Sequence, residues 1–301
     1  MRYGVMLDTS RTVDEVVGQA RSLQESGFAM AVAAQVFDHD ALTLLALVGS
    51  LVPDLELATG VVPTYPRHPI ALATQALTVQ QATGGRLTLG IGLSHQIVIE
   101  GMFGYSFDKP ARHMREYLEA LLPLLRGEQI QYEGETLKAA TMAPLGVKAP
   151  APPVLLAALA PVMLKLAGSV ADGTVTWMVG RQTLESHIVP RITAAASEAG
   201  KPAPRVSVGL PVSVTNDVDA ARERAARDFV VYGMLPSYQA MIAKEGQDGP
   251  GGMAVVGDEE SVAAQLAAIA DAGATDFVAA PYGSPEDITR TMSLLRSLIR
   301  S

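Results

Sequence analysis

The feature that most constrains the fold is a repeated boundary, at which an amphipathic helix ends in glycine and an apolar run follows. The boundary occurs at Gly27, Gly85, Gly173 and Gly273. Glycine at a helix C-terminus supplies the left-handed residue that ends the helix. The apolar runs do not alternate with polar residues, which is typical of parallel strands buried on both faces. The chain is therefore expected to alternate helices with parallel strands.

Eight apolar runs of this kind can be counted. They are Tyr3–Leu7, Met30–Gln35, Leu55–Val62, Leu87–Gly92, Val154–Leu159, Thr174–Val179, Val206–Val214 and Phe277–Pro281. Helix start signals lie between them, for example the capping-box spacing from Thr12 to Glu15. The pattern predicts an α/β fold, a (β/α)8 TIM barrel that residues 1–301 form as a single domain. A doubly wound sheet is the second possibility.

Two segments exceed the usual connections of such a barrel, one after strand 4 and one after strand 7. Residues 128–152 begin with an alternating run that predicts a small hairpin and end in a proline-rich return. Residues 216–257 hold a helical stretch and then the polar, glycine-rich run 245–252. Long insertions in compact domains are usually lids, binding loops or disordered segments, so we interpret 216–257 as a mobile cover over the site.

Composition excludes several partners and chemistries. A net charge of −8 argues against nucleic acid and against an anionic membrane surface. No apolar run approaches the roughly 18 residues of a membrane span and no signal peptide is recognisable, so we expect a soluble, cytoplasmic protein. The chain has no cysteine and its five histidines lack metal-ligand spacing, so neither thiolate catalysis nor a metal site is expected.

The third strand runs into a turn rich in glycine and proline. The stretch Leu57–Pro69 reads as a buried strand that ends abruptly, followed at once by a helix. In α/β barrels the chemistry lies at such strand ends, although an ordinary strand-to-helix loop has the same appearance. Tyr65 and Arg67 follow the turn. They are candidate contacts for an aromatic or anionic substrate, and surface polarity explains them equally well.

The fourth strand ends in the sequence Gly90-Ile91-Gly92-Leu93-Ser94-His95-Gln96. The two glycines allow a ligand to approach the backbone. The run is no dinucleotide fingerprint, because the third glycine is missing, and no nucleophile elbow, because Gln96 replaces the final glycine. His95 follows the strand and is the candidate catalytic residue, with a structural, hydrogen-bonding histidine as the alternative.

The fifth strand leads into a helix that begins near Pro161. Small residues precede this proline, so the backbone N–H groups of the helix N-terminus are open to an anion. With no Walker-type motif in the chain, such a site would hold phosphate by its backbone alone. A plain strand-to-helix junction is the other interpretation. Trp177, near the end of the sixth strand, either packs in the core or lines a cofactor pocket.

Together these segments resemble the luciferase-like flavin and deazaflavin oxidoreductases over nearly the whole chain. The resemblance rests on the order and spacing of four stretches, Ala34–Thr43, Thr59–Pro63, Gly90–Gln96 and Ala158–Asp172. The run Gly90–His95, followed by Ala167–Gly173, looks closest to the branch that uses coenzyme F420. The resemblance implies a non-prolyl cis peptide between Gly60 and Val61, whose bulge supports the ring of the cofactor.

The resemblance also implies which residues hold the cofactor and the substrate. The ring would lie over the bulge, with the phosphate near the strand-4 loop and the helix at Pro161. The cofactor contacts are expected at Gln35, Val36, Gly60, Val61, Val62, Gly92, Leu93, Ser94, Ala158, Leu159, Ala160, Pro161 and Val162. The substrate contacts are expected at Phe37, Tyr65, Arg67, Trp177 and Met178.

The chain departs from the sugar-phosphate dehydrogenases of this family. Those enzymes end strand 2 in an Asp-His pair and place a catalytic Glu after strand 4. The matching positions here are Gln35, Val36 and His95. The departure argues against glucose-6-phosphate oxidation and leaves His95 as the candidate proton donor or acceptor.

We therefore expect an F420-dependent oxidoreductase that transfers a hydride to a small organic substrate, reducing a C=C or C=N bond. An apolar pocket would suit an uncharged or amphipathic substrate, and the residues expected to form it are Val36, Phe37, Val61, Trp177 and Met178. The alternatives are an FMN-dependent monooxygenase of the same fold and a non-catalytic flavin-binding barrel. The anionic tail of F420 should need more cations than FMN, and Arg67, Lys109 and Arg112 are the candidates. Members of the family often pair through the helices after strands 2 and 3, which implies a homodimer.

Overall fold

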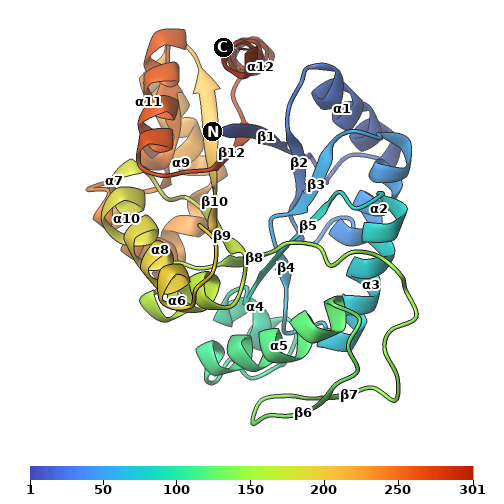
Figure 1. The fold of residues 1–301 in the computed structure, drawn as a ribbon. Coiled ribbons are helices and arrows are strands. Elements are labelled where there is room, and N and C mark those ends of the chain that lie inside the picture. The colour runs from blue at the N-terminus through green and yellow to red at the C-terminus, as the bar shows by residue number, and fades with distance from the viewer. Residues whose placement is uncertain (301) are drawn as a thin grey trace.

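The computed structural model describes residues 1–300 and shows a closed parallel barrel surrounded by helices (Figure 1). Neighbouring strands pair in parallel, and the last pairs with the first, so the sheet has closed on itself. In order around the barrel the strands are β1 (Arg2–Met6), β2 (Met30–Ala33), β3 (Glu56–Thr59), β5 (Leu87–Gly92), β8 (Val154–Ala157), β9 (Gly173–Trp177), β10 (Arg205–Val214) and β12 (Asp276–Pro281). The predicted (β/α)8 barrel is confirmed, and each predicted strand overlaps one of these eight.

Two short strands extend this sheet. β4 (Val62–Pro63) resumes the path of β3 after an interruption and pairs with β5. β11 (Val255–Gly257) pairs in parallel with the carboxyl-terminal part of β10 and has no counterpart in the sequence prediction. A three-residue strand gives too short an apolar run to be separated from the loop around it.

Helices cover the outside of the barrel. The long ones are α1 (Val13–Glu25), α2 (Ala41–Leu51), α3 (Pro69–Ala82), α5 (Pro110–Leu125), α6 (Pro161–Ser169), α8 (Val189–Glu198), α11 (Glu259–Asp271) and α12 (Pro285–Arg300). The short ones are α4 (Gln96–Gly101), α7 (Arg181–Thr183) and the π-helical turn η1 (Leu184–Ile188). Thr12 and Glu15 form the predicted capping box, and Gly27 has the left-handed φ of 84° that its position after a helix requires.

Each of the two insertions has its own ordered structure. The first forms an antiparallel hairpin of β6 (Gln131–Glu133) and β7 (Lys138–Ala140), as predicted, beyond α5 in Figure 1. The second consists of α9 (Val218–Asp228), η2 (Val230–Met234), α10 (Pro236–Lys244), η3 (Pro250–Met253) and β11. It is therefore mostly helical, and its mobility stays a prediction.

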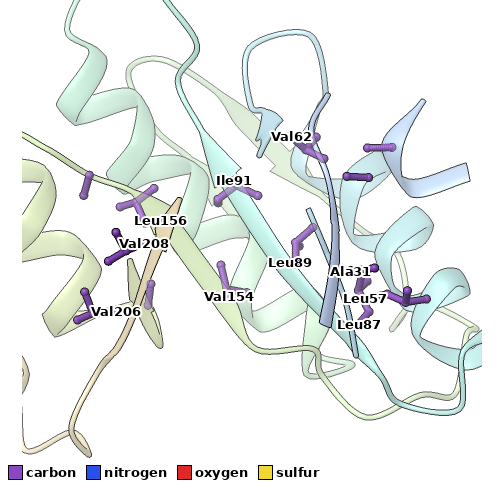
Figure 2. Close-up of a cluster of buried hydrophobic side chains, with 14 of the residues drawn as sticks. Ala31, Leu57, Val62, Leu87, Leu89, Ile91, Val154, Leu156, Val206 and Val208 are labelled. Carbon is purple, nitrogen blue, oxygen red and sulfur yellow. The ribbon is translucent and has the colours of Figure 1, made fainter. Parts of the chain in front are cut away.

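The core has two layers, because successive side chains of a strand point to opposite sides of the sheet. Leu57, Leu89, Val154 and Leu156 belong to the outer layer, between strands and helices (Figure 2). A smaller inner cluster fills the barrel itself. It contains Met30, Val32, Ala58 and Val278, each at most 7% exposed.

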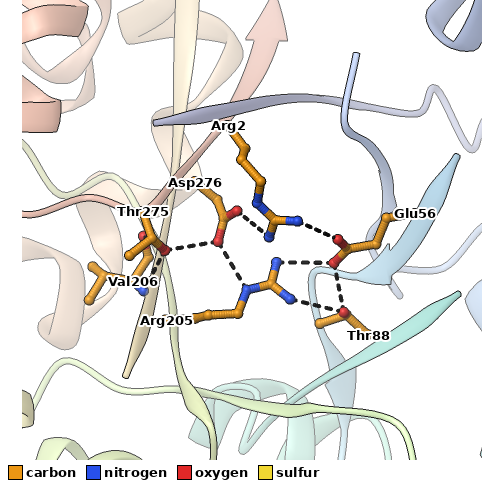
Figure 3. Close-up of polar contacts among 7 residues, drawn as sticks. All are labelled: Arg2, Glu56, Thr88, Arg205, Val206, Thr275 and Asp276. Carbon is orange, nitrogen blue, oxygen red and sulfur yellow. Dashed lines mark hydrogen bonds and ion pairs between the residues drawn. The ribbon is translucent and has the colours of Figure 1, made fainter. Parts of the chain in front are cut away.

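Charged groups close the amino-terminal end of the barrel (Figure 3). Arg205 donates from Nε to Asp276 at 3.1 Å and from Nη1 to Thr88 at 3.1 Å, and its Nη2 lies 3.0 Å from Glu56. Arg2 pairs with both carboxylates. The side chain of Asp276 is fully buried. Since five strands contribute to this network, it seals one end of the barrel and leaves the other end for a ligand.

Candidate active site at the carboxyl end of the barrel

The carboxyl ends of the strands surround an opening. Met6, Gly60, Ala157, Trp177 and Ala280 occupy inward positions here by the alternation along their strands, and all are partly exposed. The inner cluster one layer below is buried. The barrel is therefore filled from below and accessible from above, where active sites of this fold lie.

The peptide bond between Gly60 and Val61 is cis, as the resemblance implies. The backbone around it is held from β2, because the N–H of Gly60 donates to Ala33 at 2.9 Å and that of Gln35 donates to Val61 at 3.3 Å. The Val61 side chain lies over β5, directly above the glycine at position 92. The bulge that the cofactor ring is expected to contact is thus supported from both neighbouring strands.

The two glycines of β5 make room for the neighbouring strands. A Cβ at Gly90 would lie 2.0 Å from the carbonyl oxygen of Thr59, and one at Gly92 would lie 2.8 Å from Val61 and 3.1 Å from Ala157. The space beside both glycines is filled by the chain itself, so the lack of a side chain serves the packing of the strands, and a ligand contact at the Gly92 backbone stays a prediction.

His95 is the N-cap position of α4, in the short link after β5, and its side chain is half-buried. The residue before it, Ser94, has a left-handed φ of 61°. Within residues 1–300 the imidazole makes no hydrogen bond, and it does not cap its helix. Burial lowers the pKa of His95 below its usual value, so the ring is neutral at pH 7. A neutral imidazole with both nitrogens unengaged can donate or accept a proton.

Aromatic side chains from the second insertion lie across the opening. The ring of Trp177 meets Phe229 at 5.9 Å and Tyr232 at 5.8 Å between centroids, both edge to face. Tyr232 meets Tyr238 at 5.1 Å, and Tyr238 meets His95 at 5.7 Å. Sequence reasoning singled out only His95 and Trp177. The available signal was three aromatic residues in one insertion of a chain that is only 5% aromatic.

Large apolar side chains are exposed on the segments that leave this end of the barrel. Phe37 is 61% exposed after β2, Ile97 is 72% exposed after β5 and Met234 is 72% exposed after β10. The same segments also expose Val36, Met102, Phe103, Tyr105, Val230 and Val231, and the start of α6, after β8, exposes Val162. Exposed apolar groups gathered around one opening are typical of a binding face.

Other predicted contacts are engaged within the protein. Arg67 pairs with Asp40 and donates to Gln35 at 3.3 Å, while the same Gln35 oxygen accepts from the N–H of Ala41 at 2.8 Å. Tyr65 stacks between two other rings, His113 at 4.0 Å and Phe107 at 5.2 Å. Burial raises the pKa of Tyr65 to about 12 and lowers that of His113 to about 4.

The other two cations considered for the cofactor tail also have a carboxylate partner. Lys109 and Arg112 both pair with Glu135, the latter at 2.9 Å. Glu135 belongs to the hairpin connection, so the pairs lie between α5 and the first insertion. All three cations that the sequence suggested for the tail thus have a carboxylate partner, although Lys109 and Arg112 share one between them.

The start of α6 is exposed at Ala160, Pro161 and Val162, and no side chain caps it. The N–H groups of its first turn therefore remain for an anion. The carbonyl oxygen of Leu159, just before this turn, is held by His187 Nε2 at 2.7 Å.

Three predicted contacts have buried side chains. Val62, Ala158 and Met178 are at most 1% exposed and belong to the core. A ligand can reach them only through their backbone or after a local movement. Leu93 and Ser94 are partly exposed at the rim. Apolar runs that cross a strand end do not show which residue turns inward, so the sequence could not separate these cases.

Two further findings concern metal binding and membrane spans in the part of the chain that the structure describes. No group of three or more His, Asp or Glu side chains within residues 1–300 is arranged to hold a metal ion. No helix among them is long and apolar enough to cross a membrane.

The chain is similar in sequence and in structure to proteins that are already known. The model of the luciferase-like monooxygenase family matches residues 1–276. A 5,10-methylenetetrahydromethanopterin reductase of Methanolobus tindarius is 26% identical, over 85% of this chain and 78% of its own. The coenzyme F420-dependent tetrahydromethanopterin reductase of Methanopyrus kandleri has a similar structure, with a TM-score of 0.81, 23% identity and 98% and 97% of the two chains covered. The structure of the oxygenating constituent of 3,6-diketocamphane monooxygenase from Pseudomonas putida, in complex with FMN, is also similar. Its TM-score is 0.79 at 17% identity, and the match covers 100% of this chain and 97% of the other.

Proposed function

Because the chain belongs to the luciferase-like monooxygenase family, we propose that it is an F420-dependent oxidoreductase acting on a small organic substrate. The observation that carries the proposal is the unengaged, neutral imidazole of His95 at the carboxyl end of the barrel. The similarity to a methylenetetrahydromethanopterin reductase over most of both chains supports a reductase.

The residues at the opening fit a flat ring with a phosphate-bearing tail. Gly60 and Ala157 present almost no side chain there, and a Cβ at Gly60 would lie 2.7 Å from Val32. The ring would rest against the Gly60–Val61 backbone, and the uncapped first turn of α6 would bind the phosphate. When bound, the deazaflavin supplies a carbon that gives or accepts a hydride.

The chain itself would supply the proton, the apolar surroundings and the exclusion of water. His95 holds or moves the proton at one of its ring nitrogens. Trp177 and Tyr238 exclude water from the space beside it. The exposed apolar side chains Phe37 and Ile97 would contact the substrate outside the opening.

The electrostatics favour an uncharged or amphipathic substrate with a C=C or C=N bond. Arg67, the cation closest in sequence to the bulge, pairs with Asp40 and is only 19% exposed. An anionic substrate would therefore have to break this ion pair before it could use the charge of Arg67, whereas an apolar one finds a matching surface.

The paired cations also keep a second candidate open, an FMN-dependent monooxygenase. The extended anionic tail of F420 would benefit from free cations, and Lys109 and Arg112 both pair with Glu135. FMN ends at its phosphate and needs only the first turn of α6.

Titration of the purified protein with F420 and with FMN, followed by cofactor fluorescence, tests the proposal. Low-micromolar F420 binding with weak FMN binding is the expected result. The reverse preference would support the monooxygenase, and binding of neither would contradict both and favour a non-catalytic barrel. His95→Gln should keep F420 affinity within about twofold while turnover of an unsaturated acceptor is lost. Retained turnover would remove the proton role of His95.

A further inference from the structure

We propose that Tyr238 is a positioning residue, which orients the His95 imidazole and keeps water from it. The idea that His95 transfers a proton rests on the proposed function, whereas the contact itself does not. The ring centroids lie 5.7 Å apart and the planes are tilted by 55°. No hydrogen bond within residues 1–300 fixes the imidazole, so ring packing is the interaction that sets its orientation.

The contact crosses the opening of the barrel. His95 follows β5 and Tyr238 lies on α10, which follows β10, and β8 and β9 stand between these two strands in the sheet. Trp177, at the end of β9, meets Tyr232, which in turn packs on Tyr238. The second insertion therefore reaches the candidate catalytic residue through aromatic rings.

The far end of α10 is anchored separately. The Glu245 carboxylate that follows it accepts from the backbone N–H of Thr183 at 2.6 Å and of Gln182 at 3.3 Å, at the start of α7. Since α10 is held at this end, Tyr238 is presented to His95 by a fixed helix. Such support is what a side chain without hydrogen bonds of its own requires to keep one orientation.

The ionisable groups around His95 leave burial as the dominant influence on its titration. Burial alone lowers the pKa of His95. Glu100 on α4 is held by Gln96 Nε2 at 2.9 Å and by the N–H of Phe107 at 3.2 Å. Burial raises the pKa of Tyr238, with a further contribution from Tyr232, so both hydroxyls stay protonated near neutral pH. Removing the Tyr238 ring should therefore act on His95 by admitting water.

The test is an NMR titration of His95 in the cofactor-free protein, with the signal assigned from His95→Gln. Tyr238→Ala should raise the pKa of His95 towards about 6.5, the value of a solvated histidine. Tyr238→Phe should restore the low pKa. Phe229→Ala is the matched control, because Phe229 belongs to the same aromatic group but contacts Trp177, Tyr232 and Tyr282 rather than His95. It should leave the titration unchanged.

A second variant covers the case in which Tyr238→Ala does not fold. Tyr238→Leu keeps the apolar bulk and should abolish the ring-current shift of the His95 ring protons that Tyr238→Phe retains. An unchanged pKa in Tyr238→Ala, an equal rise in Phe229→Ala, or an unaltered ring-current shift in Tyr238→Leu would overturn the proposal. None of these measurements involves a cofactor, so they remain informative if neither F420 nor FMN binds.

Discussion

Val61 occupies the space that the missing side chain of Gly92 leaves above β5. A Cβ at position 92 would lie 2.8 Å from Cγ2 of Val61, closer than packed carbon atoms approach. The backbone that supports the expected cofactor ring is therefore matched in shape to the neighbouring strand. Any side chain at position 92 must move Val61 or Ala157.

The first prediction follows from this contact. Gly92→Ala should lower the free energy of unfolding by about 1–3 kcal/mol, as overpacking of a filled site does, and should weaken cofactor binding by displacing Val61. Thermal unfolding and the F420 titration measure the two effects. Gly101→Ala is the control, because no heavy atom lies within 4 Å of its added Cβ. Equal stability of the two variants would contradict the prediction.

The second prediction concerns the closed end of the barrel. Asp276→Ala leaves Arg205 and Arg2 without their fully buried partner. Both arginines keep Glu56 and Arg2 is half-exposed, so the loss should stay below the roughly 3–5 kcal/mol of a buried charge without any partner. It should still lower the midpoint of urea unfolding measurably. Glu185→Ala breaks the exposed pair with Arg181 and should cost at most about 1 kcal/mol. Similar losses in both variants would show that the network adds no stability.

The third prediction is a pH dependence from Glu56. Burial raises the pKa of this carboxyl, but the charges of Arg205 and Arg2 and the Thr88 hydroxyl outweigh burial, so the pKa lies below its usual value. A depressed pKa stabilises the fold above the unfolded value, about 4.3, and this contribution is lost as the pH falls through the folded pKa. The free energy of unfolding in urea can be measured at several pH values between about pH 3 and pH 7. Glu56→Gln should lose less of this free energy at acid pH than the parent protein does. A slope identical to that of the parent would refute the assignment.

The fourth prediction concerns the pH dependence of the proposed reaction. Burial lowers the pKa of His95, so protonated imidazole is present only at acid pH. Reduction of the substrate consumes a proton, and kcat/KM for reduction should fall as the pH rises above the His95 pKa, while oxidation should show the opposite trend. His95→Gln should flatten both profiles, whereas His39→Gln, on the loop after β2, should preserve them. An unchanged profile in His95→Gln would assign the proton step elsewhere.

The barrel could be predicted from the sequence because each strand is buried on both faces. Runs such as Leu87–Gly92 are then apolar throughout, and the helix-ending glycines mark where they begin. The three-residue β11 lacked this signal. The cis peptide bond between Gly60 and Val61 could also be predicted, because the local sequence around it resembles that of the family.

Much of the site could not be predicted, because its contacts join residues far apart in the chain. Nothing near Arg67 in the sequence shows that Asp40 neutralises it. Nothing near His95 in the sequence shows that Tyr238, which lies 143 positions later, packs on its ring. Such contacts depend on which loops meet above the barrel, and loop conformation is set by the assembled fold rather than by local pattern.

Trp177 is the one tryptophan of the chain, and it lies at the opening between Phe229 and Tyr232. Intrinsic emission excited at the indole band therefore comes from a single known position, without labelling or mutation. A chromophore bound above the barrel will quench this emission, and a displacement of the second insertion will shift its wavelength. Disturbance of the Arg2–Asp276 end will leave it unchanged until the whole barrel unfolds, so the protein carries an optical probe that distinguishes its two ends.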